Sequence, residues 1–124
     1  MGTIVKFEDI LAWQKARELN KLVYQITSTG SLDKDFGLRD QMRRSSVSIM
    51  SNIAEGYERK GDKEFLRYLN IAKGSCSELK SQTYGAFDVD FISKAQFDKL
   101  IVLLNETGKL INGFKSYLKS SLKT

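Results

Sequence analysis

Apolar side chains recur along this chain at steps of three and four residues, the spacing of one face of an α-helix. Four such stretches are expected to be helices, over residues 9–27, 35–59, 62–87 and 93–119. Long helices joined by short turns must pack as antiparallel neighbours. The pattern therefore predicts an all-α fold, an antiparallel up-down-up-down four-helix bundle that forms a single domain over residues 1–124.

The same rows predict which side chains form the core. The third stretch is the most regular, with Phe65, Leu69, Ala72, Cys76, Leu79, Thr83 and Ala86. The other expected core positions are Ala12, Ala16, Leu19, Val23 and Ile26 in the first helix, Leu38, Met42, Ile49 and Ile53 in the central helix, and Phe97, Ile101, Leu104, Gly108, Ile111, Phe114 and Leu118 in the fourth. Strict spacing of this kind produces a continuous packing seam.

Local residues mark the ends of the predicted helices. Gly30 lies in the expected first turn, residues 28–34, and glycine is a natural helix stop. Asp62 follows the Lys60-Gly61 turn and is expected to be the N-cap of the third helix. Ser93 and Gln96 have the spacing of a capping box, which predicts the start of the fourth helix.

The central helix has an apolar arc wider than one internal contact needs. Val47, Met50 and Ala54 extend the arc sideways, so we expect them to contact other subunits of a homo-oligomer. The middle of this helix also carries four serines, Ser45, Ser46, Ser48 and Ser51. Their small side chains would let a neighbouring backbone approach closely. Alternatively, some of the hydroxyls face a polyanion together with Arg43, Arg44 and Asn52.

Composition argues against an enzyme. The chain has no histidine, so it lacks the most common acid–base residue and the most common metal ligand. Cys76 is the single cysteine and lies in an apolar row, as a core residue would. No metal-ligand spacing and no glycine loop for phosphates occur, which predicts that neither a cofactor nor a metal is bound. Without a membrane-length apolar run or a leader, a cytoplasmic protein with no membrane partner is expected.

The charge is uneven along the chain. The net charge is +5, and residues 93–124 carry six lysines against two acidic residues. Such an excess suits a nucleic acid or another acidic partner, although small surpluses are common on ordinary soluble domains. The candidate RNA-binding residues are Arg39, Arg43, Arg44, Arg59, Lys60, Lys109, Lys115 and Lys119. The lysines near the C-terminal end would also complement the helix dipole.

Several segments together carry a family resemblance. They are FEDILAWQKA (7–16), FGL (36–38), QMRRSSVSI (41–49), NIAEG (52–56), EFLRYL (64–69) and AKGSCSEL (72–79). In this order and spacing the chain resembles the small bacterial four helix bundle proteins, also called 23S ribosomal RNA intervening-sequence proteins. Relatives often carry a proline in the first turn, whereas STGSLDKD has none.

The resemblance implies a four-helix bundle that assembles into a ring-like homopentamer, with no enzymatic activity attached to the family. It also connects the chain to accessory proteins of diversity-generating retroelements, which share this fold and bind RNA and a reverse transcriptase through basic surfaces. Asn52, Glu55 and Gly56 lie at family positions and are expected to be structural, as are Arg43 and Arg44 if they do not bind a ligand.

The expected function is therefore a non-enzymatic oligomeric scaffold that binds RNA or a nucleoprotein through basic surfaces. The alternative is a protein–protein interaction module whose basic surface meets an acidic protein partner, with no nucleic acid involved.

Overall fold

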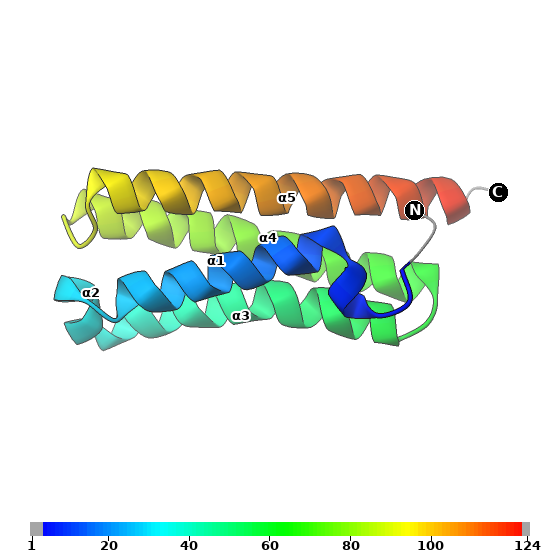
Figure 1. Cartoon of the computed structure of the whole chain (residues 1–124), viewed down its shortest axis with the longest axis horizontal. Helices are drawn as coiled ribbons and strands as arrows, with labels where there is room; N and C mark the ends of the chain where they lie inside the picture. The colour runs from blue at the N-terminus through cyan, green and yellow to red at the C-terminus, as the bar shows by residue number, and fades with distance from the viewer. Residues whose placement is uncertain (1–3, 123–124) are drawn as a thin grey trace.

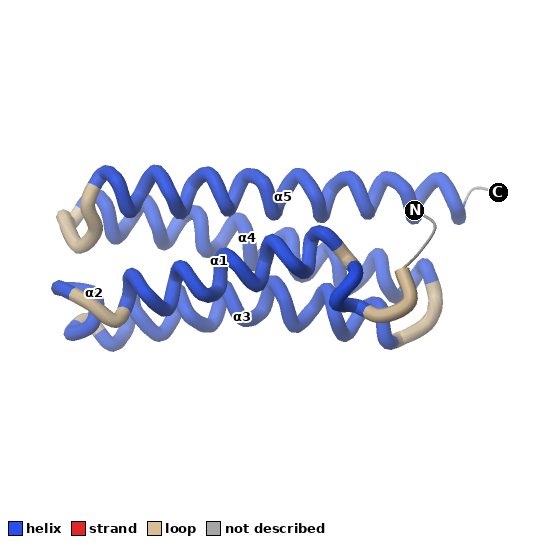
Figure 2. The backbone as a smooth tube through the Cα atoms, in the orientation of Figure 1, coloured by secondary structure: helices blue, strands red, loops and turns tan. Residues whose placement is uncertain are grey.

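The computed structural model describes residues 4–122, and this part of the chain consists of helices joined by short loops, without a strand (Figure 2). A 3-10 turn, Phe7–Asp9, precedes α1 (Leu11–Thr27). The elements that follow are α2 (Gly30–Lys34), α3 (Phe36–Glu58), α4 (Asp62–Asp88) and α5 (Lys94–Leu122). Successive long helices run in opposite directions along one axis (Figure 1). The predicted all-α bundle is confirmed.

Each long helix packs against two others, so the four enclose one core. Helix α3 contacts α1 and α4, and α5 contacts the same two helices from the other side. Helices α3 and α5 are therefore diagonal to each other, as are α1 and α4. This order decides which basic side chains can share a surface.

The core predictions are confirmed for α1 and α4, where every expected position is buried. In α3, Met42, Ile49 and Ile53 are fully buried, whereas Leu38 is half-buried. The buried hydroxyl of Thr83 donates to the Leu79 carbonyl at 2.8 Å. This bond within the helix turn allows a polar side chain in the seam, because a buried hydroxyl must have a partner.

The prediction for α5 is confirmed at Leu104, Gly108, Ile111 and Leu118, whereas Phe97, Ile101 and Phe114 pack against the core but are only half-buried. Leu100, which the spacing did not predict, is fully buried. Residues 100–104, LIVLL, are apolar on every side of the helix, so the spacing alone does not identify the inward face. Thr107 is also buried, and its hydroxyl donates to the Leu103 carbonyl at 2.7 Å.

Two predicted helix starts also need correction. Helix α1 begins at Leu11 rather than residue 9, because the Asp9 carboxylate accepts from the backbone amides of Val5 and Lys6 and holds the preceding turn. Gly61 occupies the N-cap position of α4, so Asp62 is the first helical residue and not the cap.

The connections differ from prediction in one place. The expected first turn contains the short helix α2, which begins at Gly30 with a φ of +63°. That left-handed conformation favours glycine. The Asp35 carboxylate caps α3 by accepting from the Leu38 amide at 3.0 Å. The capping box at α5 is confirmed, because Ser93 and Gln96 exchange side-chain to backbone hydrogen bonds of 2.9 and 3.1 Å.

Helices α3 and α4 approach each other closely at Gly56. A Cβ atom at this position would lie 2.7 Å from the Tyr68 Cβ and 2.9 Å from the Phe65 Cδ1. We expect Gly56→Ala to lower the free energy of unfolding by about 1–3 kcal/mol, because the two helices must move apart. Urea denaturation at fixed protein concentration measures the change.

Gly74→Ala is the matched control. Gly74 lies in the middle of α4, and a Cβ there meets no atom within 4 Å. Because alanine favours the helix, this variant should gain up to about 1 kcal/mol. Equal stabilities for the two variants would contradict the close approach at Gly56.

Candidate functional site

A groove lined by lysines runs between α4 and α5. Lys73 and Lys80 are seven residues apart and therefore lie on the same side of α4. The Lys80 Nζ donates to the Asn105 Oδ1 of α5 at 3.1 Å. Further along, the Lys73 Cε would lie 3.5 Å from a Cβ placed at Gly108, so the absence of a side chain makes room for the lysine stem. These two contacts fix how the helices face each other.

The groove encloses about 500 Å³ and presents hydrogen-bond donors. Its lining consists of Lys73, Cys76, Ser77, Lys80, Leu104, Asn105, Gly108, Lys109 and Asn112. The floor is apolar, since Cys76 and Leu104 are buried. Every polar side chain in the lining can donate a hydrogen bond and none is a carboxylate, which suits an anionic group.

Two more lysines extend the basic surface along α5. Burial lowers the pKa of the Lys115 ammonium, and the positive charges of Lys119 and Lys73 lower the pKa further. Lys115 is therefore near enough to Lys73 and Lys119 to be repelled by both. We call Lys73, Lys80, Lys109, Lys115 and Lys119 the lysine groove.

The carboxylates closest in sequence are occupied elsewhere. Glu106 pairs with Lys15 of α1 at 3.2 Å, and Glu78 accepts from Ser45 of α3 at 3.3 Å. Among residues 4–122, no ion pair involves a member of the lysine groove. The groove therefore has an uncompensated positive charge that a bound anion would neutralise.

The predicted arginines of α3 do not join this groove. Arg39, Arg43 and Arg44 lie in the first half of α3, near α2, whereas Lys115 and Lys119 lie toward the opposite end of the bundle on the diagonal helix α5 (Figure 1). Arg59 directly follows the last residue of α3. Lys60 is exposed in the α3–α4 turn, and its φ is 55°. The chain therefore has more than one basic region.

Most of these arginines contact the chain itself. Arg39 pairs with Asp40 at 3.1 Å, and Arg59 pairs with Glu55 at 3.2 Å. Arg44 is exposed and makes no hydrogen bond or ion pair within residues 4–122.

Arg43 ties α3 to the end of α1. Its Nε donates to the Thr27 Oγ1 at 2.9 Å, and its Nη2 donates to the Ser28 Oγ at 3.0 Å. The guanidinium also lies over the Tyr24 ring, 4.6 Å from its centroid. Three contacts hold this side chain against α1, so its loss would affect packing as well as surface charge.

The family positions lie at the α3–α4 contact. The Asn52 Nδ2 donates to the Ser48 carbonyl at 2.8 Å, and the Ser48 hydroxyl shares a 2.8 Å hydrogen bond with Ser75 of α4. On the other side, the Ser46 hydroxyl donates to the Asn20 Oδ1 of α1 at 2.8 Å. These contacts favour the packing interpretation of the serines, since only Ser51 among the four is exposed.

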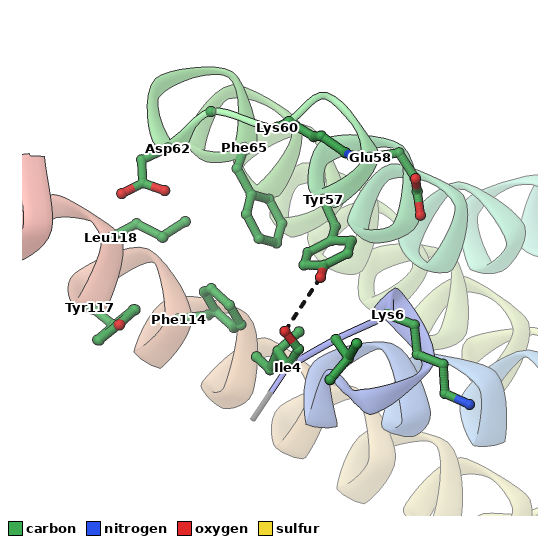
Figure 3. A pocket seen from close by; sticks show the side chains of 12 residues that line it. Ile4, Lys6, Tyr57, Glu58, Lys60, Asp62, Phe65, Phe114, Tyr117 and Leu118 are labelled. Atoms are coloured by element: carbon green, nitrogen blue, oxygen red, sulfur yellow. Dashed lines mark hydrogen bonds between the residues drawn. The ribbon is translucent and has the colours of Figure 1, made fainter. Parts of the chain in front are cut away.

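A second cavity of about 500 Å³ lies at the end of the bundle where α3 gives way to α4 (Figure 3). The Tyr57 hydroxyl donates to the Ile4 carbonyl at 3.4 Å and holds the N-terminal segment beside it. Phe65 and Phe114 line the cavity, with ring centroids 5.1 Å apart. Its lining includes the acidic Glu58 and Asp62, so it lacks the uniform positive charge of the lysine groove.

Cys76, the thiol in the lining of the lysine groove, is not a reactive nucleophile. Burial raises the pKa of the Cys76 thiol to about 11, which keeps the thiol protonated and unreactive at neutral pH. Over the described range, no cluster of three or more histidine, cysteine or acidic residues could hold a metal ion. The helices between residues 4 and 122 also include none long and apolar enough to cross a bilayer.

Known proteins with a similar sequence or structure support the helical fold. A family described as the 23S rRNA-intervening sequence protein matches residues 8–113. A crystal structure of a protein of unknown function from the S23 ribosomal protein family of Bacteroides thetaiotaomicron is similar, with a TM-score of 0.78 and 22% sequence identity over 86% of this chain and 96% of that one. No curated protein matches.

Proposed function

The chain belongs to the 23S rRNA-intervening sequence protein family, and from this membership we propose that it binds RNA phosphates at the lysine groove without catalysing a reaction. The observation that carries the proposal is the set of adjacent α4 and α5 lysines that no carboxylate neutralises. Phosphates that bind beside Lys115 relieve its repulsion by Lys73 and Lys119. Binding is therefore favoured by the charge arrangement of the free protein.

The chemistry of the groove favours the RNA backbone over particular bases. Lysine ammonium groups contact phosphate oxygens as mobile point charges and read little sequence. Ser77, Asn105 and Asn112 add neutral donors beside them. We therefore expect salt-sensitive binding with weak sequence preference.

The proposal includes assembly of several copies, in the form of the homopentamer that the resemblance implies. Val47 is 39% exposed on α3, with Met50 and Ala54 half-buried beside it. Leu11 and Val102 are also exposed, so apolar surface is available on other helices. Repetition of the lysine groove around an assembly would multiply weak phosphate contacts into useful affinity. Such an assembly could also hold a reverse transcriptase or another protein partner.

Chemical footprinting tests where RNA binds. The full chain is acetylated with and without a short single-stranded oligouridylate at low salt, and each lysine is quantified by mass spectrometry. We expect RNA to protect Lys73, Lys109 and Lys119, because phosphate contacts cover their amines. Lys21 and Lys34, which lie outside the groove, serve as internal controls and should keep their reactivity.

The same experiment distinguishes RNA binding from the alternative, an acidic protein partner. Poly-glutamate of matched charge replaces the RNA in a parallel sample. Stronger protection by poly-glutamate than by RNA would favour an acidic protein partner. Equal reactivity with and without RNA would contradict the proposal, and light scattering on each sample gives the mass of the assembly.

A further inference from the structure

We propose that the lysine groove leads to an aromatic platform at Tyr84, and that the RNA bound there is single-stranded with one base stacked on the Tyr84 ring. This inference rests on the proposed function, since it specifies which form of RNA the groove takes. It adds an aromatic side chain to a site whose other proposed RNA contacts are lysines and neutral hydrogen-bond donors.

Tyr84 lies one helical turn beyond Lys80 on the same side of α4. Cross-helix contacts with α5 follow one another along this face, from Lys73 with Gly108, to Lys80 with Asn105, to Tyr84 with Phe97. From Lys73 to Tyr84 the axial distance is about 16 Å at the rise of an α-helix. A strand lying along the groove therefore reaches Tyr84 within a few nucleotides.

Tyr84 is held in place by its neighbours, yet the residue remains 48% exposed. Its ring meets Phe97 edge-on, with centroids 5.0 Å apart and planes at 76°. Phe97 in turn stacks on Phe87 at 4.5 Å. Because the aromatic neighbours fix the ring from the core side, little conformational freedom is lost when a base stacks on it.

Two other tyrosine rings, those of Tyr24 and Tyr68, are already covered by arginine. The Arg43 guanidinium lies over Tyr24, and Arg59 and Arg67 lie over Tyr68. Within the described residues, no cation lies over Tyr84; the nearby Lys94 amine lies over Phe97 instead. Tyr84 is thus a tyrosine with an available ring beside the lysine groove.

An aromatic ring on this surface selects for unpaired RNA. Bases in a duplex have both faces covered by their neighbours, so a side chain cannot stack on them without opening the helix. An unpaired base offers its face at no such cost, and stacking on an aromatic side chain tolerates any base. Lysine contacts alone would accept either form.

The test compares Tyr84→Leu with Tyr84→Phe, which keeps the ring, and with Tyr24→Leu, which removes a comparably exposed tyrosine on α1 whose ring Arg43 already covers. Fluorescence anisotropy gives the Kd of the full chain for a single-stranded oligouridylate and for an RNA duplex of the same length. Tyr84→Leu should weaken single-strand binding by at least about fivefold, as expected for one lost base–aromatic stack. The other two variants should bind as the wild type does, and duplex affinity should not change.

Photocrosslinking supplies a second readout that needs no substitution. A bromouridine-containing single strand is irradiated with the wild-type protein, and the adduct is expected on the peptide that contains Tyr84. If RNA binding is salt-sensitive but Tyr84→Leu binds the single strand as the wild type does, base stacking on Tyr84 is wrong. Phosphate binding at the lysine groove is then retained. No RNA binding by the wild type would overturn both.

Discussion

Replacing Leu69 by aspartate is expected to lower the free energy of unfolding by at least about 4 kcal/mol, a large part of the stability of an ordinary small domain. Leu69 has no exposed surface and lies in the middle of the α4 core row. The substitution loses the packing of a buried leucine and leaves a carboxylate without water or a partner. Circular dichroism during urea denaturation measures the loss at fixed protein concentration.

Asn70→Asp is the control for this variant. It adds the same charge one residue away, on the exposed side of α4. Because water still solvates that carboxylate, its effect should stay within about 0.5 kcal/mol. A cooperative Leu69→Asp transition near that of the wild type would show that the assigned core row is wrong.

Neutralising three groove lysines is expected to weaken single-stranded RNA binding at least about tenfold at low salt. Each substitution removes one charge-assisted contact with a phosphate. The variant carries Lys73→Gln, Lys109→Gln and Lys119→Gln. Glutamine keeps most of the aliphatic stem and removes the charge, so packing along the groove is retained. Filter binding with an oligouridylate gives the Kd.

A second triple variant controls for net charge. Lys21→Gln, Lys34→Gln and Lys99→Gln remove the same three charges from exposed positions outside the groove. Its affinity should fall much less, because these side chains act only through the screened long-range field. Equal losses of RNA affinity in the two triple variants would indicate that net charge attracts the RNA, without specific binding at the lysine groove.

The sequence predicted most of the fold because the apolar rows of α1 and α4 have one clear inward face. In α5, apolar residues surround the helix near Leu100, and only packing against α1 and α4 selects the buried ones. The 3-10 turn before α1 depends on the Asp9 carboxylate meeting backbone amides, which no apolar period encodes.

The site was less predictable than the fold. Lys109, Lys115 and Lys119 could be named from the charge of the fourth helix. Lys73 and Lys80 were missed, since they come from a segment in which acidic residues outnumber basic ones. Their seven-residue spacing indicates that they share one side of the helix. It points to a joint site with the α5 lysines only once α4 is known to lie antiparallel beside α5.

Arginine roles were also hidden from the sequence. Arg43 was predicted to contact RNA, and its side chain is held by Thr27 and Ser28 at the end of α1. Those partners are fifteen and sixteen residues away in the chain and become neighbours only through tertiary packing. Charge composition alone cannot distinguish such an arginine from Arg44, which is exposed.

The salt dependence of RNA binding tests the central claim most directly. Filter binding across a salt series gives the slope of log affinity against log salt concentration for the wild type and both triple variants. The account predicts a steep negative slope for the wild type, and a slope shallower by about 2 for the groove triple, at about 0.7 per lost phosphate contact on a single strand. The control triple should keep the wild-type slope. One common slope for all three proteins, or no RNA bound at low salt, would contradict phosphate binding at the lysine groove.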